Sequence, residues 1–236
     1  MALDPSEVSR RHSPQEAKAY DLHPVEVALP VARRRTLFAK RVFDVTASCA
    51  AIIALTPLFA IIAIAIKIDS RGPVFFRQIR VGRNGEPFVI WKFRTMLPNA
   101  DRVAPNVSPS SDPRVTRVGR FLRSTYLDEL PQLFNVIAGT MSVVGPRPET
   151  PEFVALYTAD ERRVLDVKPG LLGPSTLASM DESAILDAAD DPFTYYVDVL
   201  MHERVRLDLA YLDEMSFGTD VKLLVLQLSK IILGRG

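Results

Sequence analysis

The chain is 236 residues long and carries a formal net charge of +1 at pH 7. This length can bury one sizeable core, while the near-zero charge gives no global field that would attract nucleic acid. One cysteine and three histidines exclude an internal disulfide and a histidine-rich zinc site. The sequence lacks the glycine-rich loops of P-loop and dinucleotide-binding enzymes and the Gly-x-Ser-x-Gly turn of hydrolases, so those enzyme classes are excluded as well.

The N-terminal segment shows little periodicity. Residues 1–32 contain four prolines and mixed charges, a composition that does not build an apolar core. We therefore predict that residues 1–35 form a mobile tail, and we assign it no chemistry.

The most apolar segment, Val45 to Ile66, runs for 22 residues without a charged side chain. About 20 apolar residues in a helix match the roughly 30 Å hydrocarbon core of a bilayer, whereas a cleavable signal peptide is shorter and begins earlier. Pro57, preceded by Thr56, lies near the middle of the segment and removes one helical hydrogen bond, a disturbance of about 3 kcal/mol. A membrane helix with a kink at Thr56-Pro57 is therefore expected.

Basic residues flank this segment equally on both sides. Because basic residues stay on the cytoplasmic face, we predict that residues 36–69 form a re-entrant hairpin that bends at Thr56-Pro57 and returns to the face it entered. A kinked helix that crosses the membrane is the alternative, since membrane helices tolerate proline. The flanking basic residues are Arg33, Arg34, Arg35, Lys40, Arg41, Lys67, Arg71, Arg77, Arg80 and Arg83.

A small β-hairpin is predicted next. The segments 74–81 and 88–96 flank Asn84-Gly85, which is a strong signal for a two-residue hairpin turn. Lys92 and Arg94 alternate with two aromatic residues, so one face of the second strand is expected to be apolar and the other cationic. This cationic face is either solvated or part of a phosphate site. Residues 97–113, rich in Pro, Ser, Asn and Asp, are expected to form a long loop that orders when substrate binds.

The chain is organised around two adjacent acids, Asp128 and Glu129. Four arginines precede them at every third residue, a spacing that places cations along roughly one helix face. Because an unpaired carboxylate is expensive to bury, this arrangement indicates a site for an anion and a metal rather than packing. The four arginines are Arg114, Arg117, Arg120 and Arg123.

Pro131 predicts where the following helix begins, since proline is best tolerated in a first turn. The helix is expected to run from near Asp128 to Gly139 with both carboxylates at its amino end, where the dipole favours their ionised forms by about 0.3 to 1 kcal/mol each. Simple capping by Asp128 is the alternative interpretation. Further helices are predicted over 152–167, 181–189 and 195–215. The apolar helix 221–233 is expected to pack on the hairpin or lie in the membrane interface, with a buried core helix as the alternative.

Several sequence blocks in order resemble the bacterial sugar transferase family, the monotopic phosphoglycosyl transferases that act on polyprenyl phosphate. The resemblance covers about residues 36–236 and implies a mostly helical α+β fold. The implied protein is a minimal catalytic form of the family, monotopic in the bacterial inner membrane, with residues 70–236 as the catalytic domain on the cytoplasmic face and interfacial helices at its C-terminus. The blocks are Lys40-Arg41-Val42-Phe43-Asp44, Trp91-Lys92-Phe93-Arg94-Thr95-Met96, Leu127-Asp128-Glu129-Leu130-Pro131, Gly145-Pro146-Arg147-Pro148-Glu149 and Lys168-Pro169-Gly170.

The resemblance also implies a reaction. A UDP-sugar would give its sugar-1-phosphate to polyprenyl (undecaprenyl) phosphate and release UMP, the first membrane step of surface glycan assembly. Asp128 would be the nucleophile that forms a covalent phosphosugar intermediate, and Glu129 would bind Mg²⁺. Lys92, Arg123 and Arg147 would bind the phosphates of the substrate or nucleotide. Membrane lipids are implied partners, nucleic acid is not, and a homodimer is compatible with the sequence.

The sequence departs from the family pattern in two places, of which the second lies where nucleotide or sugar recognition is expected. Thr140 stands where many relatives have an acid, and Gly173-Pro174-Ser175-Thr176 replaces a common Gly-Trp-Ala-Gln. The sugar that is transferred therefore stays open, because a few side chains decide it. A nucleotide-sugar pyrophosphatase and a non-catalytic membrane scaffold of the same fold are the alternative functions.

Overall fold

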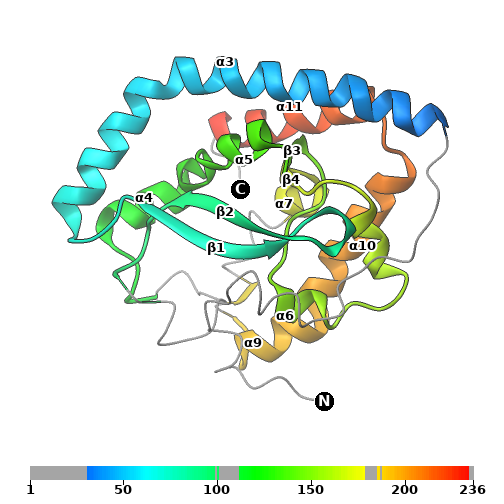
Figure 1. Cartoon of the computed structure of the whole chain (residues 1–236). Helices are drawn as coiled ribbons and strands as arrows, with labels where there is room; N and C mark the ends of the chain where they lie inside the picture. The colour runs from blue at the N-terminus through cyan, green and yellow to red at the C-terminus, as the bar shows by residue number, and fades with distance from the viewer. Residues whose placement is uncertain (1–30, 99, 101–111, 179–184, 187, 234–236) are drawn as a thin grey trace.

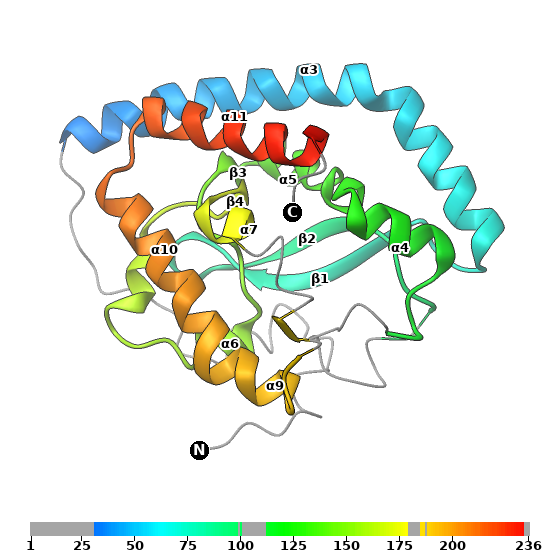
Figure 2. The same ribbon diagram turned by 180° about the vertical axis from the view of Figure 1, so that it is seen from behind.

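The computed structural model of the chain describes residues 31–98, 100, 112–178, 185–186 and 188–233. Residues 1–30 of the predicted tail, most of the loop 97–113 and most of the predicted helix 181–189 lie outside the described residues. The described part is a mostly helical α+β structure with two small two-stranded sheets. The long helix α3 (Val31–Asp69) arches over the rest of the molecule, with α11 (Phe217–Leu233) beneath its N-terminal half (Figures 1 and 2).

Helix α3 remains one continuous helix of 39 residues through Pro57, and it changes direction in its second half (Figure 1). Two local features favour such a bend. Pro57 has no backbone donor, and the Thr56 hydroxyl donates to the Ile52 carbonyl oxygen at 2.8 Å, a bond pattern that often bends helices. Its stretch Phe38–Asp69 is long and apolar enough to cross a membrane, and only 11% of its most apolar window is buried. In this respect the helix differs from the core helix of a soluble protein, which is mostly buried.

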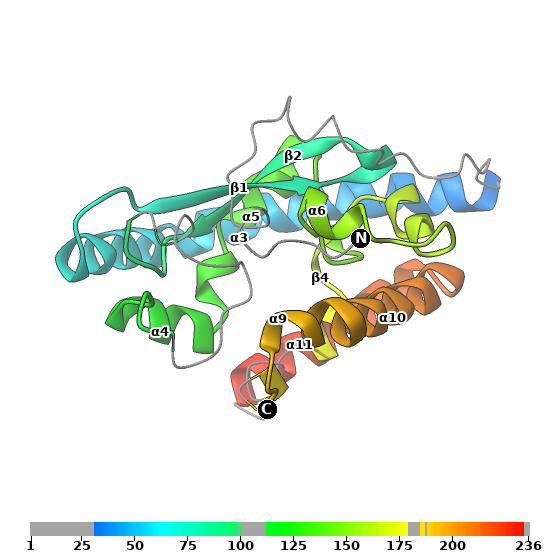
Figure 3. The same cartoon turned by 90° about the horizontal axis from the view of Figure 1, so that it is seen from below.

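The predicted β-hairpin is confirmed. Strands β1 (Phe75–Val81) and β2 (Pro87–Phe93) pair antiparallel. The connection contains Asn84 and Gly85 at φ 60° and 76°, the left-handed conformation that an Asn-Gly turn favours. The hairpin lies on one side of the molecule, with α4 (Arg117–Ser124) and α10 (Met201–Asp213) on the other (Figure 3).

The two faces of β2 differ from the expectation that Lys92 and Arg94 share a cationic face. Phe88 and Ile90, which have the same parity as Lys92 along the strand, are buried in an apolar cluster. The Lys92 side chain is only 17% exposed, so its face is turned toward the protein interior rather than toward solvent. Arg94 follows the end of β2 and donates to the carbonyl oxygens of Ser70 and Arg71. It therefore supports the chain after α3 instead of facing an anion.

The C-terminal half is less regular than predicted. The expected single helix 152–167 is wrong, because the structure has a short α6 (Pro151–Val154) and a 3-10 helix η4 (Glu161–Asp166). Thr158 and Glu161 explain the break. Glu161 accepts a hydrogen bond from the Thr158 backbone N–H at 2.8 Å, and Thr158 Oγ1 accepts one from the Glu161 N–H at 3.3 Å. This capping box begins a new helix in the middle of the predicted one.

The predicted helix 195–215 is confirmed, although it begins at Pro192, ends at Asp213 and contains a π-helical segment. Helix α9 (Pro192–Tyr195), the π-helical segment η6 (Tyr196–Leu200) and α10 follow one another without a gap. Helix α11 is not a buried core helix. It contacts α3 through Phe217 and Phe43, whose ring centroids lie 5.5 Å apart, and it exposes other apolar side chains. These exposed residues include Val221, Val225, Leu226, Leu228 and Leu233.

The remaining elements include the turn that holds the acidic pair. A 3-10 turn η3 and a short helix α5 follow α4, and two three-residue strands, β3 and β4, pair in parallel. Their bounds are η3 Leu127–Glu129, α5 Gln132–Ala138, β3 Ser142–Val144, β4 Gly170–Leu172 and α7 Pro174–Ala178.

Candidate active site

Asp128 and Glu129 lie in the turn η3 between α4 and α5. Tyr126, which precedes the turn, has a φ of 57°, an uncommon conformation for a residue with a bulky side chain. The helix expected to begin near Asp128 starts there as a 3-10 turn: η3 begins at Leu127, Leu130 and Pro131 keep right-handed helical backbone angles, and α5 begins at Gln132. The two acids therefore lie in a 3-10 turn that leads directly into α5. The predicted helix end at Gly139 is confirmed by its left-handed φ of 89°.

Glu129 is paired with two cations from distant parts of the chain. Lys92 Nζ of β2 lies 2.7 Å from Glu129 Oε1, and Arg147 Nη2, from the loop after β3, lies 3.7 Å from the same oxygen. Burial alone would raise the pKa of Glu129, but the charges of Lys92 and Arg147 outweigh it and lower the pKa to about 2. Glu129 is therefore ionised throughout the physiological pH range.

Asp128 differs from its neighbour. Its side chain is buried, and this burial raises its pKa to about 6, although Lys92 and Arg123 favour the charged form. The negative charge of Glu129 contributes to the same increase. Any contribution of the helix dipole to the ionised form of Asp128 is outweighed, because burial and a like charge dominate. At pH 7 about nine-tenths of this carboxyl group is still ionised.

Only one of the four arginines before the acids is close to them. Arg123 donates through Nε to Thr95 Oγ1 at 3.1 Å, and its charge acts on Asp128. Arg117 and Arg120 are exposed, and Arg114 precedes α4 and pairs with Asp112 at 2.6 Å. A three-residue step along an α-helix falls short of a full turn by about 60°, so the arginines spread around α4 instead of forming one face.

The loop that carries Arg147 is fixed by close backbone contacts. Gly145 N–H donates to the Leu172 carbonyl oxygen at 2.9 Å, and Gly170 N–H donates to the Pro146 carbonyl oxygen at 2.8 Å. A Cβ atom on Gly145 would lie 2.7 Å from the backbone oxygen of Lys168, a distance that real Cβ atoms do not show. Two sequence blocks, Gly145-Pro146-Arg147-Pro148-Glu149 and Lys168-Pro169-Gly170, therefore pack directly on each other and position Arg147.

One sequence comparison decides the family. The family profile described as bacterial sugar transferase matches residues 35–234. The chain belongs to the bacterial sugar transferase family. Among its relatives, the chain is 40% identical over 220 residues to an undecaprenyl-phosphate glucose phosphotransferase of Komagataeibacter xylinus, which covers 88% of this chain and 39% of the relative.

Two further relatives show the range of lengths in the bacterial sugar transferase family. A UDP-glucose:undecaprenyl-phosphate glucose-1-phosphate transferase of Klebsiella pneumoniae is 39% identical over 81% of this chain and 39% of its own length. The uncharacterized sugar transferase EpsL of Bacillus subtilis is 36% identical over 85% of this chain and 90% of its own length. The chain thus spans about two-fifths of the first two relatives and most of the third.

The structure assigns supporting contacts to another block of the bacterial sugar transferase resemblance, Lys40 to Asp44. Lys40 Nζ pairs with Asp220 Oδ2 of α11 at 2.5 Å. Arg41 donates to the carbonyl oxygens of Val136 and Ile137 at the end of α5. Asp44 Oδ1 accepts the backbone N–H of Val143 in β3 at 3.0 Å. These residues fasten α3 to α11, α5 and β3, which their spacing alone did not reveal.

Sequence reasoning missed a second buried charge cluster beside Arg147. Glu149 Oε2 pairs with Arg80 at 3.1 Å, and Glu149 Oε1 accepts from Tyr196 Oη at 3.0 Å and Arg204 at 3.4 Å. Burial opposes the charge of Glu149, but the arginines outweigh it and lower its pKa. Glu149 lies two residues after Arg147 in the sequence, and this proximity could have indicated that Glu149 belongs to the same site. Arg204, by contrast, lies 55 residues further along the chain, where no pattern relates it to the site.

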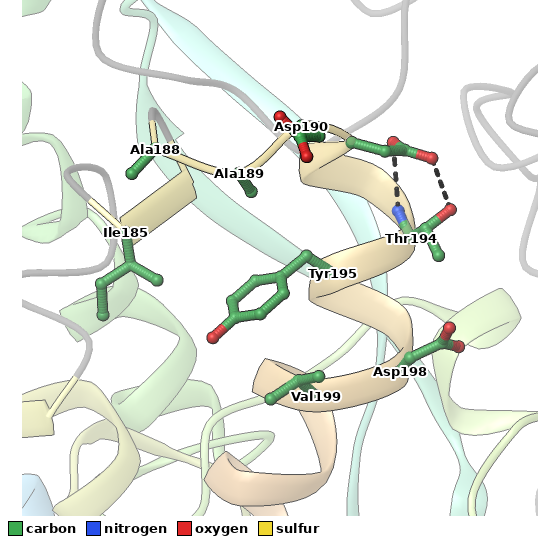
Figure 4. Close-up of a pocket in the computed structure, with 9 residues that line it drawn as sticks. Ile185, Ala188, Ala189, Asp190, Thr194, Tyr195, Asp198 and Val199 are labelled. Atoms are coloured by element: carbon green, nitrogen blue, oxygen red, sulfur yellow. Dashed lines mark hydrogen bonds between the residues drawn. The ribbon is translucent and has the colours of Figure 1, made fainter.

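A separate hollow lies along α9 and η6, and it does not contain any predicted site residue (Figure 4). Asp191 on its rim accepts from the N–H groups of Phe193 and Thr194, so this acid caps a helix. Thr56 and Pro57, the predicted bend residues, lie exposed on α3 and do not line this hollow.

The site offers few metal ligands by itself. The described residues contain no group of three or more His, Cys, Asp or Glu side chains that could hold a metal ion. Asp128 and Glu129 supply carboxylate oxygens, the ligand type that Mg²⁺ prefers, and Mg²⁺ is commonly held by one or two carboxylates together with substrate phosphates. The donor set therefore fits a magnesium ion that is shared with a diphosphate.

Proposed function

We propose that the chain is a phosphoglycosyl transferase that moves a sugar-1-phosphate from a UDP-sugar to undecaprenyl phosphate and releases UMP. The observation that carries this proposal is the meeting of Asp128 and Glu129 with Lys92 and Arg147, which three separate parts of the chain contribute. An acidic pair surrounded by cations suits a reaction in which negative charge moves between phosphates. The names of the relatives support the same donor and acceptor classes.

The proposed reaction has two displacement steps. A carboxylate oxygen of Asp128 attacks the sugar-bearing phosphorus, the P–O bond to the nucleotide phosphate breaks, and UMP leaves with the bonding electron pair. An oxygen of the lipid phosphate then attacks the acyl phosphate, which restores the Asp128 carboxylate and forms the lipid diphosphosugar. Because a carboxylate is largely ionised at neutral pH, the first step needs no general base.

The cations have distinct tasks in this proposal. Lys92 and Arg147 neutralise the oxygens of the diphosphate, and the planar guanidinium group of Arg147 can contact two of them at once. Arg123 favours the ionised form of Asp128. Glu129, with Asp128, would hold Mg²⁺, and this ion would neutralise charge on the departing phosphate. Glu129 suits that role because it stays ionised at physiological pH.

The membrane places the acceptor. We propose that α3 enters the inner membrane, bends and returns to the cytoplasmic face, so that the site lies at the interface where the phosphate of a polyprenyl chain resides. The apolar side chains that α3 and α11 expose support this placement. They include Phe38, Ile53, Ile61, Ile64 and Ile68 on α3 and Val225 and Leu233 on α11.

The donor sugar is proposed by class. UDP-glucose is the first donor to test, because the names of several relatives specify glucose. One relative at 33% identity is a galactosyl transferase, so UDP-galactose belongs in the same panel.

The decisive experiment measures UMP release by the detergent-solubilised protein with Mg²⁺ and each UDP-sugar, with and without undecaprenyl phosphate. Release that requires the lipid and disappears in Asp128→Asn supports the transferase. Asp213→Asn is the matched control, since Asp213 is an exposed aspartate of α10. Release without lipid would indicate a pyrophosphatase. Full function of the Asp128→Asn variant in cells would indicate a scaffold instead.

A further inference from the structure

Helix α10 carries a buried acid, Asp208, and a mostly buried arginine, Arg204, one turn apart. Arg204 and Asp208 are spaced i, i+4, so they lie on the same face of the helix. Asp208 is 3% exposed, and the side chain of Arg204 is 14% exposed. Burial lowers the pKa of Arg204 to about 10 and raises that of Asp208 to about 6. Burying charged groups costs stability. We therefore ask what the contacts of these two side chains do.

Asp208 uses both carboxylate oxygens as acceptors. Oδ2 accepts the backbone N–H of Arg147 at 3.0 Å and the Ser175 hydroxyl at 2.8 Å, while Oδ1 accepts the backbone N–H of Ser175 at 3.2 Å. All three partners donate. An asparagine in this place would present an amide N–H₂ group to one of the two sites and leave at least one backbone donor unpaired.

Arg204 contacts the other end of the same short segment. Its guanidinium group donates to Glu149 Oε1 at 3.4 Å and to Tyr196 Oη at 3.1 Å, and it lies over the Tyr196 ring at 5.4 Å. From the opposite side, Arg80 pairs with Glu149 and donates to the Pro148 carbonyl oxygen at 3.1 Å. One face of α10 therefore holds the segment Arg147–Glu149 at both ends: Asp208 binds its first residue and Arg204 its last.

We infer that Asp208 is a positioning residue for the proposed transfer reaction, acting through Arg147. The Arg147 guanidinium group reaches Glu129 at 3.7 Å with its side chain 25% exposed, so the group remains partly accessible to a donor phosphate while its backbone is fixed. Fixing the backbone preorganises the cation and reduces what must be ordered when the diphosphate binds. Arg204 and Glu149 assist by fixing the end of the segment.

Ser175 distinguishes this role from simple packing. Its hydroxyl and backbone N–H bind the same carboxylate, so they hold α7 to α10 without contacting the acidic pair. Asp208 is thus joined to the scaffold through Ser175 and to the site through the single bond to the Arg147 N–H. Removing the Ser175 hydroxyl leaves the bond to Arg147 in place. Asparagine at position 208 either turns its amide N–H₂ group toward the Arg147 N–H or accepts from it without the negative charge, and both weaken the bond.

The test is a double-mutant cycle measured by UMP release, and it rests on the proposed function. Asp208→Asn should lower kcat/KM by about 10- to 100-fold, the usual range for loss of a hydrogen bond to a charged group. In an Arg147→Ala background the same change should lower it by less than about 3-fold, because nothing remains to be positioned. Asp213→Asn, which changes an exposed aspartate on the same helix, should change kcat/KM by less than about 3-fold.

Thermal unfolding separates positioning from stability. Asp208→Asn should shift Tm equally with and without Arg147, whereas its effect on kcat/KM depends on Arg147. If the effects of Asp208→Asn and Arg147→Ala on kcat/KM are independent and simply multiply in the double variant, the inference is overturned and the proposed function is left intact. A native chain that is inactive with every donor would overturn both. If Asp208→Asn does not fold, Asp208→Glu, which displaces the carboxylate by one methylene group, takes its place in the cycle.

Discussion

Replacement of Lys92 by methionine tests the electrostatic account of the acidic pair. Methionine keeps the length and apolar stem of the side chain but removes the ammonium group that lies 2.7 Å from Glu129 Oε1. Burial raises the pKa of Asp128 and Glu129, and the charge of Lys92 is the largest influence that lowers both. Loss of an adjacent opposite charge raises the pKa of a carboxyl group by about 1 to 3 units.

The variant should therefore raise the pKa of Asp128 from about 6 to about 7 or above. A carboxylate nucleophile acts only when it is deprotonated, so activity is lost as the pH falls through the pKa of the folded protein. At pH 7 the ionised fraction of Asp128 should fall from about nine-tenths to about one half. The acid limb of kcat/KM for UMP release should move from near pH 6 to near pH 7, whatever the overall loss of activity.

Two features make this experiment decisive. Arg120→Gln removes an exposed cation from α4 and should leave the acid limb in place, which controls for a general change of charge. An acid limb that stays near pH 6 in Lys92→Met would refute the reasoning. The limb would then report another group, such as Asp208, whose pKa burial also raises to about 6.

Three other substitutions test the scaffold and its energetics. Lys40→Met leaves Asp220 buried without its cation and should lower the unfolding free energy by about 3 kcal/mol or more, seen as a lower Tm. Gly145→Ala would place a Cβ 2.7 Å from a backbone oxygen and, by displacing the loop, should lower kcat/KM by about 10- to 100-fold. Asp128→Asn should be inactive but more stable at pH 7.5. The buried acid binds its proton more tightly in the folded protein than in the unfolded chain. The stability of the native protein therefore falls as the pH rises from about 4 to about 6, by up to about 3 kcal/mol. The advantage of the Asn variant in Tm should shrink at pH 5.

Features set by neighbouring residues could be predicted from the sequence. The turn at Asn84-Gly85 and the helix end at Gly139 depend on local backbone conformation, and both are found in the structure. The apolar helix over Val45 to Ile66 followed from its composition. The Thr158/Glu161 capping box was equally local, so the mistaken helix 152–167 came from a signal that was present but not used.

Features set by distant contacts could not be predicted in the same way. Asp208 meets the Arg147 N–H across 61 positions of sequence, and Lys40 meets Asp220 across 180. Helical spacing predicts that α10 is a helix, but not which of its polar residues face inward. The arginine repeat failed for the related reason that a period of three does not follow the helix turn, so only Arg123 approaches the acids.

The two adjacent acids have different pKa values because their surroundings differ, and residues that are distant in the sequence form those surroundings. Lys92 and Arg147 both approach Glu129, which lowers its pKa to about 2, whereas burial beside this negative charge raises the pKa of Asp128 to about 6. Environments that separate the pKa values of two neighbouring carboxyl groups are typical of groups with separate tasks. A permanently charged Glu129 suits an ionic partner for cations, and an Asp128 with a raised pKa and little hydration suits a nucleophile. The division therefore depends on how the loop after β3 and strand β2 are held, which is why a residue as distant as Asp208 can affect the reaction.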